Sequence, residues 1–203
     1  MIVRPLVLKF GGSLLDRAPD LVPVVASAPG RPILVVPGGG VLADAVRELE
    51  PPPGAAHWMA IAAMEQVGLY LSSLGLPAVE GLCAPRAPSV LLPYHLLRER
   101  DPLPHSWRVS SDTIAAWCAA ELGADLLLAK SVDGILVGGR LARVLERPVE
   151  SDAVDPCLVP FLAARGVRAE IVNARAPGRL ARALRGEPVP GTRIDPSLFV
   201  DRA

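Results

Sequence analysis

Short apolar runs recur along the chain, and most of them lead into a glycine-containing turn or a helical pattern. The segments IVRPLVLKF at 2–10, ILVV at 33–36 and DLLLA at 125–129 are apolar nearly throughout, without a polar residue at every second position. Such runs are typical of strands buried on both faces of a sheet. The same reasoning predicts further strands near 77–80, at 168–172 and near 192–194.

Helical periodicity fills most of the segments between these strands. Residues 41–49 carry apolar side chains at 41, 42, 45, 46 and 49, which is the spacing of one helix face. The segment Ser110–Asp112 can cap a helix that Gly123 ends. The predicted helices cover about 14–27, 41–49, 55–74, 112–122, 156–165 and 177–185.

Two segments depart from this alternation. We expect residues 81–109 to be irregular and to form a lid or substrate region, because prolines interrupt them repeatedly. The segment ILVGGRLARV at 135–144 predicts a hairpin that turns at Gly138 and Gly139.

Alternating strands and helices predict an α/β fold, in which helices cover both faces of a mainly parallel sheet. We find neither an internal repeat nor a linker, so we expect one domain over residues 1–203. Ligands of such sheets bind beyond the C-terminal ends of the strands. The turns that follow the strands are therefore the places to look for chemistry.

Composition and charge narrow the function classes. The 203 residues include 21 basic and 21 acidic side chains, so we expect neither nucleic acid nor a membrane surface as a partner. The 3 cysteines are far apart and form no CxxC pair, so we predict no metal site and a cytoplasmic, reducing location. Arg4 and Pro5 interrupt the first apolar run, which therefore does not read as a signal peptide.

Lysine is rare in this chain, since Lys9 and Lys130 are its only lysines among 21 basic residues. The abundance of Arg, Ala, Pro and Gly suggests a coding bias that replaces solvent lysines by arginine. A lysine that persists under such a bias is a candidate for chemistry that needs a compact point charge, although chance survival is the alternative.

Two glycine turns share one design. Gly11, Gly12 and Ser13 follow the first strand, and Gly38, Gly39 and Gly40 follow the second; a predicted helix comes next in both places. Glycine lets the backbone approach a ligand, and the amides of a helix N-terminus favour an anion. One such turn can be purely conformational, but two turns with Lys9 beside the first suit a polyphosphate. Neither turn has the spacing of a Walker or a Rossmann loop.

The motifs LKFGGSLL, VVPGGGVLADAVRE, SSDTIAAWCAAELGADLLLAKSVDGI and GTRI resemble those of the amino acid kinase superfamily, and they span residues 6–194. The resemblance implies a three-layer αβα sandwich with an acceptor-binding half at about 1–122 and an ATP-binding half at about 123–203. It also implies ATP and Mg²⁺ as cofactors and a homo-oligomer, a dimer or larger.

The resemblance further implies roles for single residues. Lys9 matches the lysine that stabilises the transferring phosphoryl group, Asp112 the aspartate that orients the catalytic lysines, and Lys130 a lysine on the nucleotide side. The residues expected to bind ATP or its phosphates are Gly11, Gly12, Ser13, Lys130, Ser131, Asp133, Gly134 and Asn173.

One motif of the superfamily is missing. Acetylglutamate-type members carry a lysine in a GGM-x-x-K motif, but the corresponding segment here, ERPVESDAVDPCLVP, has none. This departure argues against acetylglutamate and aspartate kinases, and we expect Lys130 to take over part of the missing lysine's role.

A narrower resemblance rests on HWMAIAAMEQ, LPHSWRVSSDTIAA and VNARAPGRLARALRGEPVPGTRI. These segments are similar to the small kinases of methanofuran-type cofactor synthesis, which convert (5-(aminomethyl)furan-3-yl)methyl phosphate to its diphosphate. The residues expected at the acceptor are Gly38, Gly39, Gly40, Asp44, His57, Glu65, His105, Trp107 and Arg108, with Asp44 or Glu65 paired to the amine. The alternatives are a uridylate or isopentenyl phosphate kinase, or a non-catalytic nucleotide-binding protein of the same fold.

Overall fold

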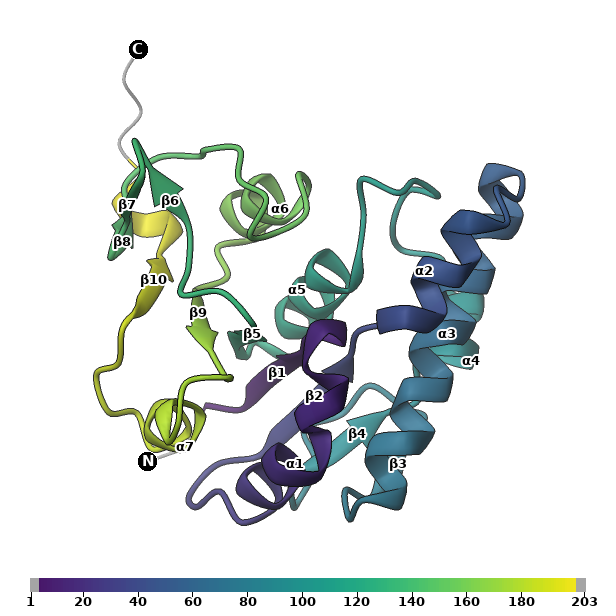
Figure 1. Ribbon diagram of the computed structural model, residues 1–203, viewed down its shortest axis with the longest axis horizontal. Helices are drawn as coiled ribbons and strands as arrows, with labels where there is room; N and C mark the ends of the chain where they lie inside the picture. The colour runs from purple at the N-terminus through teal and green to yellow at the C-terminus, as the bar shows by residue number, and fades with distance from the viewer. Residues whose placement is uncertain (1–3, 200–203) are drawn as a thin grey trace.

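The computed structural model describes residues 4–199, and its centre is a sheet of 8 strands in the order β3-β4-β2-β1-β5-β9-β10-β8 (Figure 1). Within the described residues, β9 and β10 are the one antiparallel pair of this sheet, and the other neighbours run parallel. The fold is therefore α/β with a mainly parallel sheet, as the sequence predicted. The strands are β1 (Leu6–Phe10), β2 (Ile33–Pro37), β3 (Ala78–Val79), β4 (Ser89–Leu91), β5 (Asp125–Lys130), β8 (Val144–Leu145), β9 (Ala169–Asn173) and β10 (Gly191–Ile194).

Helices cover both faces of the sheet (Figure 1). The residues of one face pack with α5 and α6, and those of the other pack with α1 and α7. The helix α3 contributes side chains to both hydrophobic clusters. The helices are α1 (Ala18–Ala26), α2 (Gly40–Glu48), α3 (Pro53–Ser73), α4 (Pro93–Arg100), α5 (Ser111–Leu122), α6 (Leu158–Arg165) and α7 (Arg179–Leu184), with 3₁₀ segments at Gly12–Arg17 and Pro196–Leu198.

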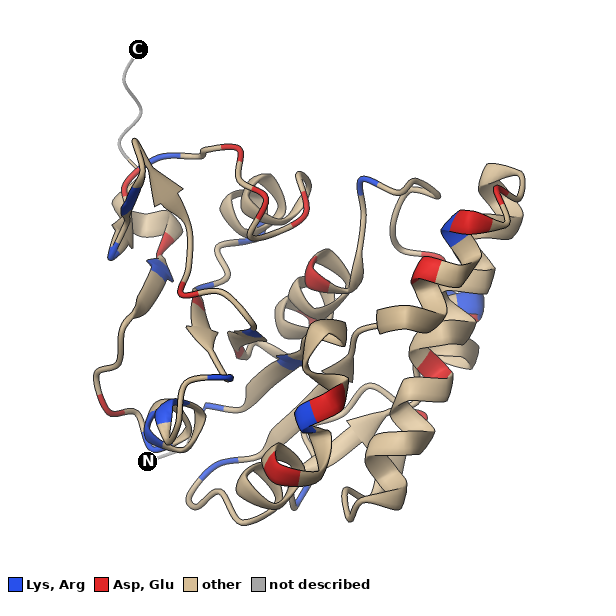
Figure 2. Ribbon diagram, in the orientation of Figure 1, with Lys and Arg blue, Asp and Glu red and all other residues tan. Residues whose placement is uncertain are grey.

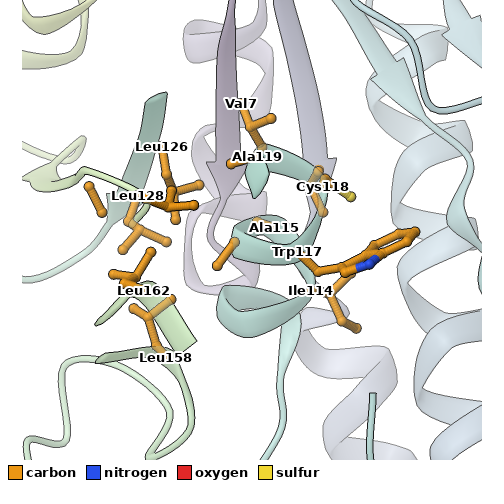
Figure 3. Close-up of a cluster of buried hydrophobic side chains, with 14 of the residues drawn as sticks. Val7, Ile114, Ala115, Trp117, Cys118, Ala119, Leu126, Leu128, Leu158 and Leu162 are labelled. Carbon is orange, nitrogen blue, oxygen red and sulfur yellow. The ribbon is translucent and has the colours of Figure 1, made fainter. Parts of the chain in front are cut away.

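The alternation of side chains along the central strands decides which residues face α5. In β1, Val7 packs in the cluster around α5, whereas Leu8 and Phe10 pack in the opposite cluster. In β5, Leu128 packs with α5 and Ala129 on the other face (Figure 3). Because side chains alternate with a period of two, Lys9 and Lys130 both belong to the α5 face.

The helix α5 has clear signals at both ends. The hydroxyl of Ser110 accepts a hydrogen bond from the amide of Asp112 at 3.2 Å, so Ser110 is the N-cap. Gly123 ends the helix in the left-handed region at φ 57°. These two residues place Asp112 in the first turn, beside the C-terminal ends of the strands.

The structure corrects the expectation that residues 81–109 are irregular. This segment contains β4 and α4, and Pro93 begins α4 rather than interrupting it. Proline is tolerated at the first helical position because its missing amide would have no partner there. The sequence also missed the two-residue strand β8, whereas the hairpin of β6 (Leu136–Val137) and β7 (Arg140–Leu141) is confirmed.

The helix predicted over about 14–27 begins differently from the expectation. Its first turns form the 3₁₀ segment Gly12–Arg17, and the α-helical part starts at Ala18. In the part of the chain that the structure describes, no helix is both long enough and apolar enough to cross a bilayer.

Candidate active site

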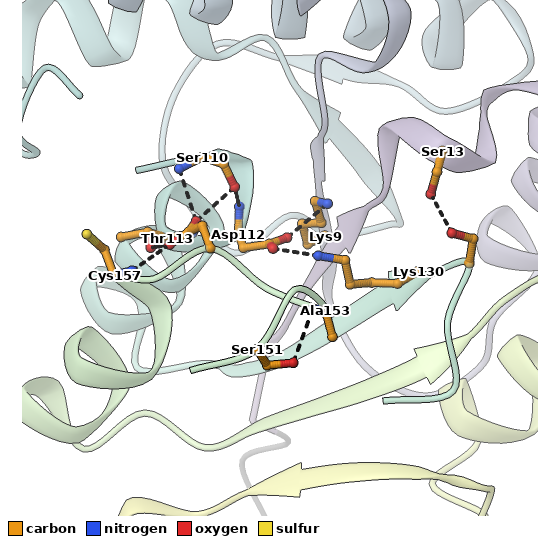
Figure 4. A network of polar contacts seen from close by, with 11 residues as sticks. Lys9, Ser13, Ser110, Asp112, Thr113, Lys130, Ser151, Ala153 and Cys157 are labelled. Atoms are coloured by element: carbon orange, nitrogen blue, oxygen red, sulfur yellow. Dashed lines mark hydrogen bonds and ion pairs between the residues drawn. The ribbon is translucent and has the colours of Figure 1, made fainter. Parts of the chain in front are cut away.

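The two lysines lie at the C-terminal ends of neighbouring parallel strands. In the register of β1 and β5, Lys9 pairs with Leu128, so Lys130 lies two residues further along β5. Both side chains extend toward the first turn of α5, as their place in the alternation requires (Figure 4).

The carboxylate of Asp112 lies between the two lysines. Its Oδ1 is 2.9 Å from Nζ of Lys9, and its Oδ2 accepts a hydrogen bond from Nζ of Lys130 at 2.6 Å (Figure 4). The residue is only 2% exposed, so water cannot compensate its charge. The three residues that the sequence predicted as catalytic are thus in direct contact.

The charges of Lys9, Asp112 and Lys130 influence the protonation of this cluster. Burial by itself would raise the pKa of Asp112, but the charges of Lys9 and Lys130 outweigh burial, and the pKa is lowered. Burial and the charge of Lys9 lower the pKa of Lys130, although Asp112 opposes them. Two ammonium groups share one carboxylate, so the cluster presents excess positive charge to an anion.

The glycine turns after β1 and β2 meet each other beside the lysines. A Cβ atom on Gly12 would lie 2.4 Å from Cα and N of Gly40, and one on Gly38 would lie 2.8 Å from N of Gly12. The close packing of the two turns therefore requires glycine there, whether or not a ligand binds. Glycine is required at position 11 for a similar reason, because a Cβ atom there would lie 2.7 Å from the carbonyl oxygen of Ala129.

A cavity of about 270 Å³ opens in front of the lysines and the glycine turns. It extends along α2 and the first half of α3 to the loop before α5. The predicted site residues that line it are Lys9, Gly12, Ser13, Gly38, Gly39, Gly40, Asp44, His57, Trp107, Asp112 and Lys130. It brings together residues predicted for the phosphates, for catalysis and for the acceptor.

Glu65 does not line this cavity, in contrast to our expectation. Its carboxylate accepts a hydrogen bond from the backbone amide of Tyr94 at 2.8 Å, in the first turn of α4. An acidic group at a helix N-terminus satisfies an amide that has no partner within the helix. Arg108 is also absent from the lining, so Asp44 is the carboxylate that the structure leaves at the acceptor end.

His105 does not line the first cavity itself, but it packs against His57, which does. Its ring stacks on that of His57, with the centroids 4.0 Å apart and the planes at 13°, and its Nε2 is 2.8 Å from Oδ1 of Asp101. These three side chains are close enough together to suggest a metal site. However, the in-plane lone pairs of two nearly parallel rings do not converge on one point, so we assign no metal to them.

A second cavity, of about 680 Å³, lies beyond β5 and β9. Its lining includes Ser131, Asp133, Gly134 and Asn173, all of which were predicted on the nucleotide side. Ser131 follows Lys130 directly, and its hydroxyl is 3.0 Å from that of Ser13 (Figure 4). The two cavities therefore adjoin at the end of β5.

Several polar residues of the site were missed at the sequence level. The guanidinium of Arg47 lies 4.7 Å from the ring centroid of Trp107 and donates to Asp44 at 2.8 Å. Arg175 donates to the carbonyl of Ser13 at 2.8 Å, and Arg179 pairs with Asp133. With 19 arginines in the chain, arginine identity alone carries no signal; the position of Arg175 just after Asn173 was the available clue.

Acidic and basic residues are otherwise interspersed along the ribbon (Figure 2). Many of the ion pairs join exposed partners, such as Arg17 with Asp20. Surface pairs of this kind contribute little to stability. The ion pairs of Asp112 with the two lysines are exceptional because all three side chains are largely buried.

Comparison with known proteins agrees with the predicted fold. The family model described as "Amino acid kinase family" matches residues 77–147. A protein of Methanocaldococcus jannaschii named [5-(aminomethyl)furan-3-yl]methyl phosphate kinase is 27% identical over 201 residues, which cover 89% of this chain and 93% of that protein.

Solved kinase structures share the fold. The UMP kinase of Ureaplasma parvum superposes with a TM-score of 0.72 at 16% identity, covering 95% of this chain and 100% of that chain. The uridylate kinase of Archaeoglobus fulgidus gives 0.70 at 21% identity, covering 94% and 99%, and an isopentenyl phosphate kinase gives 0.64 at 22%, covering 93% and 99%.

The fold and the matches together support a kinase. The predicted resemblance to the amino acid kinase family is confirmed, and the chain is similar to the aminomethylfuran phosphate kinase of M. jannaschii.

Proposed function

We propose that this protein transfers the γ-phosphoryl group of ATP to the phosphate of a small acceptor, [5-(aminomethyl)furan-3-yl]methyl phosphate, to form its diphosphate in methanofuran-type cofactor synthesis. The observation that carries the proposal is the convergence of Lys9 and Lys130 on the buried Asp112, where two cavities adjoin. The similarity to the M. jannaschii kinase supports the choice of acceptor.

Phosphoryl transfer depends mainly on positive charge and on the positioning of the two substrates. Phosphoryl transfer between two anions needs positive charge along the line of transfer and little covalent participation by the protein. Lys9 and Lys130 supply this charge, and Asp112 holds their ammonium groups apart from each other. A phosphate acceptor is ionised at neutral pH, so the reaction needs no general base.

The two cavities suggest where each substrate binds. We place ATP in the second cavity, with its phosphates reaching Ser13 and Lys130, and the acceptor in the first cavity beside Asp44 and Trp107. This assignment corresponds to an N-terminal acceptor-binding half and a C-terminal ATP-binding half.

Mg²⁺ belongs to this scheme as part of the substrate. Asp112, the buried carboxylate of the first cavity, already pairs with the two lysines through both of its oxygens. The metal would therefore arrive with ATP and neutralise charge on its phosphates.

The acceptor assignment is tested by ADP release with MgATP and three acceptors: the aminomethylfuran phosphate, UMP and isopentenyl phosphate. We expect turnover with the furan only. Turnover with UMP or isopentenyl phosphate instead would keep the phosphate chemistry and replace the acceptor. Bound ATP without turnover on any acceptor would favour the non-catalytic alternative.

Replacing Lys130 with alanine should weaken ATP binding about tenfold or more, because a charge-assisted contact to phosphate contributes about 1.5–3 kcal/mol. Isothermal titration with a non-hydrolysable ATP analogue measures this loss. A change confined to the KM of the acceptor would instead place Lys130 on the acceptor side.

Replacing Asp44 with asparagine should raise the KM of the aminated acceptor about tenfold, since the variant loses the negative charge that faces the ammonium. The same acceptor without its amine should be used about equally by both proteins. Glu65→Gln is the matched comparison, because Glu65 caps α4 and should not distinguish the two acceptors. Discrimination by Glu65→Gln rather than by Asp44→Asn would reverse our assignment.

A further inference from the structure

Asp155 lies on the loop between β8 and α6, yet its carboxylate binds the first turn of the helix that carries Asp112. Its Oδ2 accepts hydrogen bonds from N and Oγ of Ser110, at 3.0 and 2.8 Å, and from N of Thr113 at 3.0 Å. Its Oδ1 accepts from Oγ1 of Thr113 at 2.6 Å and from N of Cys157 at 3.0 Å. Figure 4 shows Ser110, Thr113 and Cys157 gathered around this point.

This one side chain caps α5 from outside the helix. The amides of a first helical turn have no partners within the helix, and a carboxylate there also interacts favourably with the helix dipole. Ser110 relays the contact, because its hydroxyl donates to Asp155 and accepts from the amide of Asp112. The backbone of Asp112 is thus fixed through Ser110 by a residue of another segment.

The loop that carries Asp155 also borders the second cavity. Glu150, Ser151, Asp152 and Ala153 line that cavity, and Asp155 follows them after a single buried valine. A movement of this loop would therefore be transmitted to the first turn of α5.

We propose that Asp155 is a positioning residue that fixes the first turn of α5, so that Asp112 holds Lys9 and Lys130 in the geometry for phosphoryl transfer. The proposal rests on the proposed function. It also connects the loop beside the candidate nucleotide cavity with the catalytic carboxylate.

The negative charge of Asp155 also helps to keep Lys130 protonated. Burial and the charge of Lys9 lower the pKa of Lys130, whereas Asp112 and Asp155 oppose this decrease. Loss of the Asp155 charge should therefore shift the titration of Lys130 to lower pH. No other lysine signal interferes with this measurement, because the chain has only these two lysines.

The test compares Asp155→Asn with the wild type in two readouts. In protein labelled with ¹³C at lysine Cε, NMR reports one signal for each of the two lysines. The signal that is missing from the spectrum of Lys130→Arg belongs to Lys130. We expect the Lys130 signal of Asp155→Asn to move and to titrate at lower pH. With MgATP and the acceptor, we expect kcat to fall about 10- to 100-fold, the loss typical of a small displacement of catalytic groups.

Asp195→Asn is the matched control. Asp195 also caps a short helical segment, accepting from N and Oγ of Ser197, but it lines neither cavity. We expect its lysine signals and kcat to equal those of the wild type. If Asp155→Asn does not fold, Ser110→Ala removes only the two hydrogen bonds of the Ser110 hydroxyl, to Asp155 and from the amide of Asp112. It should change the same readouts in the same direction, by less.

An Asp155→Asn protein that melts earlier, but keeps both lysine signals and the wild-type kcat, would overturn the proposal and leave Asp155 as a structural cap. A lower kcat with unchanged lysine signals would overturn it as well. Absence of kinase activity in the wild type would count against the proposed function, while the titration of Lys130 would still decide whether Asp155 positions the cluster.

Discussion

Replacing Lys9 with alanine should lower kcat by about 100- to 1000-fold, the loss seen when one preorganised charge or donor is removed from a transition state. Lys9 is 5% exposed, and its ammonium lies 2.9 Å from Asp112, so its position is fixed before any substrate binds. A preorganised charge needs no reorganisation during the reaction, which is why its loss affects kcat more than binding.

The alanine variant should still fold, because Lys130 continues to neutralise Asp112. ATP affinity measured by isothermal titration should change less than threefold, since we place Lys9 at the transferring group rather than at the nucleotide. Lys9→Arg is the informative companion variant. It keeps the charge, but the planar guanidinium cannot take the place of a compact ammonium in a buried site, so we expect a similar loss of kcat. Near-normal turnover by either variant would remove Lys9 from the catalytic assignment.

The candidate catalytic cluster could be predicted from the sequence for a physical reason. Lys9 and Lys130 end two apolar strands, and the capping signal at Ser110 places Asp112 in the first turn of a helix. Parallel strands align these ends, and the period of two along each strand directs both lysines to the face that the helix covers. Local rules therefore place these three residues together at one end of the sheet, whereas the role of Asp112 was implied by the resemblance to the amino acid kinase superfamily.

The acceptor end was harder to predict because it depends on contacts between segments far apart in the chain. On α3, Glu65 was one of two carboxylates predicted to pair with the acceptor's amine, and the structure instead gives it the amide of Tyr94, 29 residues away. Asp155 carried no signal of its own, since its partners Ser110 and Thr113 are 45 and 42 residues away. The composition of a segment does not reveal which distant amides it will meet.

The same limit explains the error over residues 81–109. Five prolines suggested a loop, but Pro93 begins α4, where its fixed φ suits a helix start. The neighbouring strand β4 has only three residues, Ser89–Leu91, which is too short for a pattern to predict. Pairing with β2 and β3 stabilises it, and pairing is a property of the assembled sheet.

Replacing Asp112 with asparagine should destabilise the fold by about 3–5 kcal/mol at neutral pH, because two buried ammonium groups lose the carboxylate that they share. For a domain of this size, the melting temperature should fall by roughly 10 °C, measured by differential scanning calorimetry. Catalysis should be lost as well, since neither lysine keeps its orientation.

The dependence of stability on pH shows whether the missing charge of Asp112 causes the loss of stability. In the wild type, the pKa of Asp112 is lowered by the lysines, so this carboxylate stabilises the fold above the pKa of an unfolded aspartate, about 3.9, and the contribution disappears as pH falls through the folded pKa. In the variant, burial lowers the pKa of Lys130 without the opposing charge of Asp112, so the unfolded chain binds more protons and stability rises with pH. The difference in the free energy of unfolding between the wild type and Asp112→Asn should therefore be largest near neutral pH and become smaller at both low and high pH.

A triple variant completes the test. Replacing Asp112 with asparagine and both lysines with methionine removes the charges together, so no uncompensated charge is left in the buried site. This variant should melt above Asp112→Asn and have no activity. A melting temperature for Asp112→Asn within about 2 °C of the wild type at pH 7, well below the shift of roughly 10 °C expected here, would mean that water reaches the lysines. The site would then be too open for the buried electrostatics on which the proposed mechanism depends.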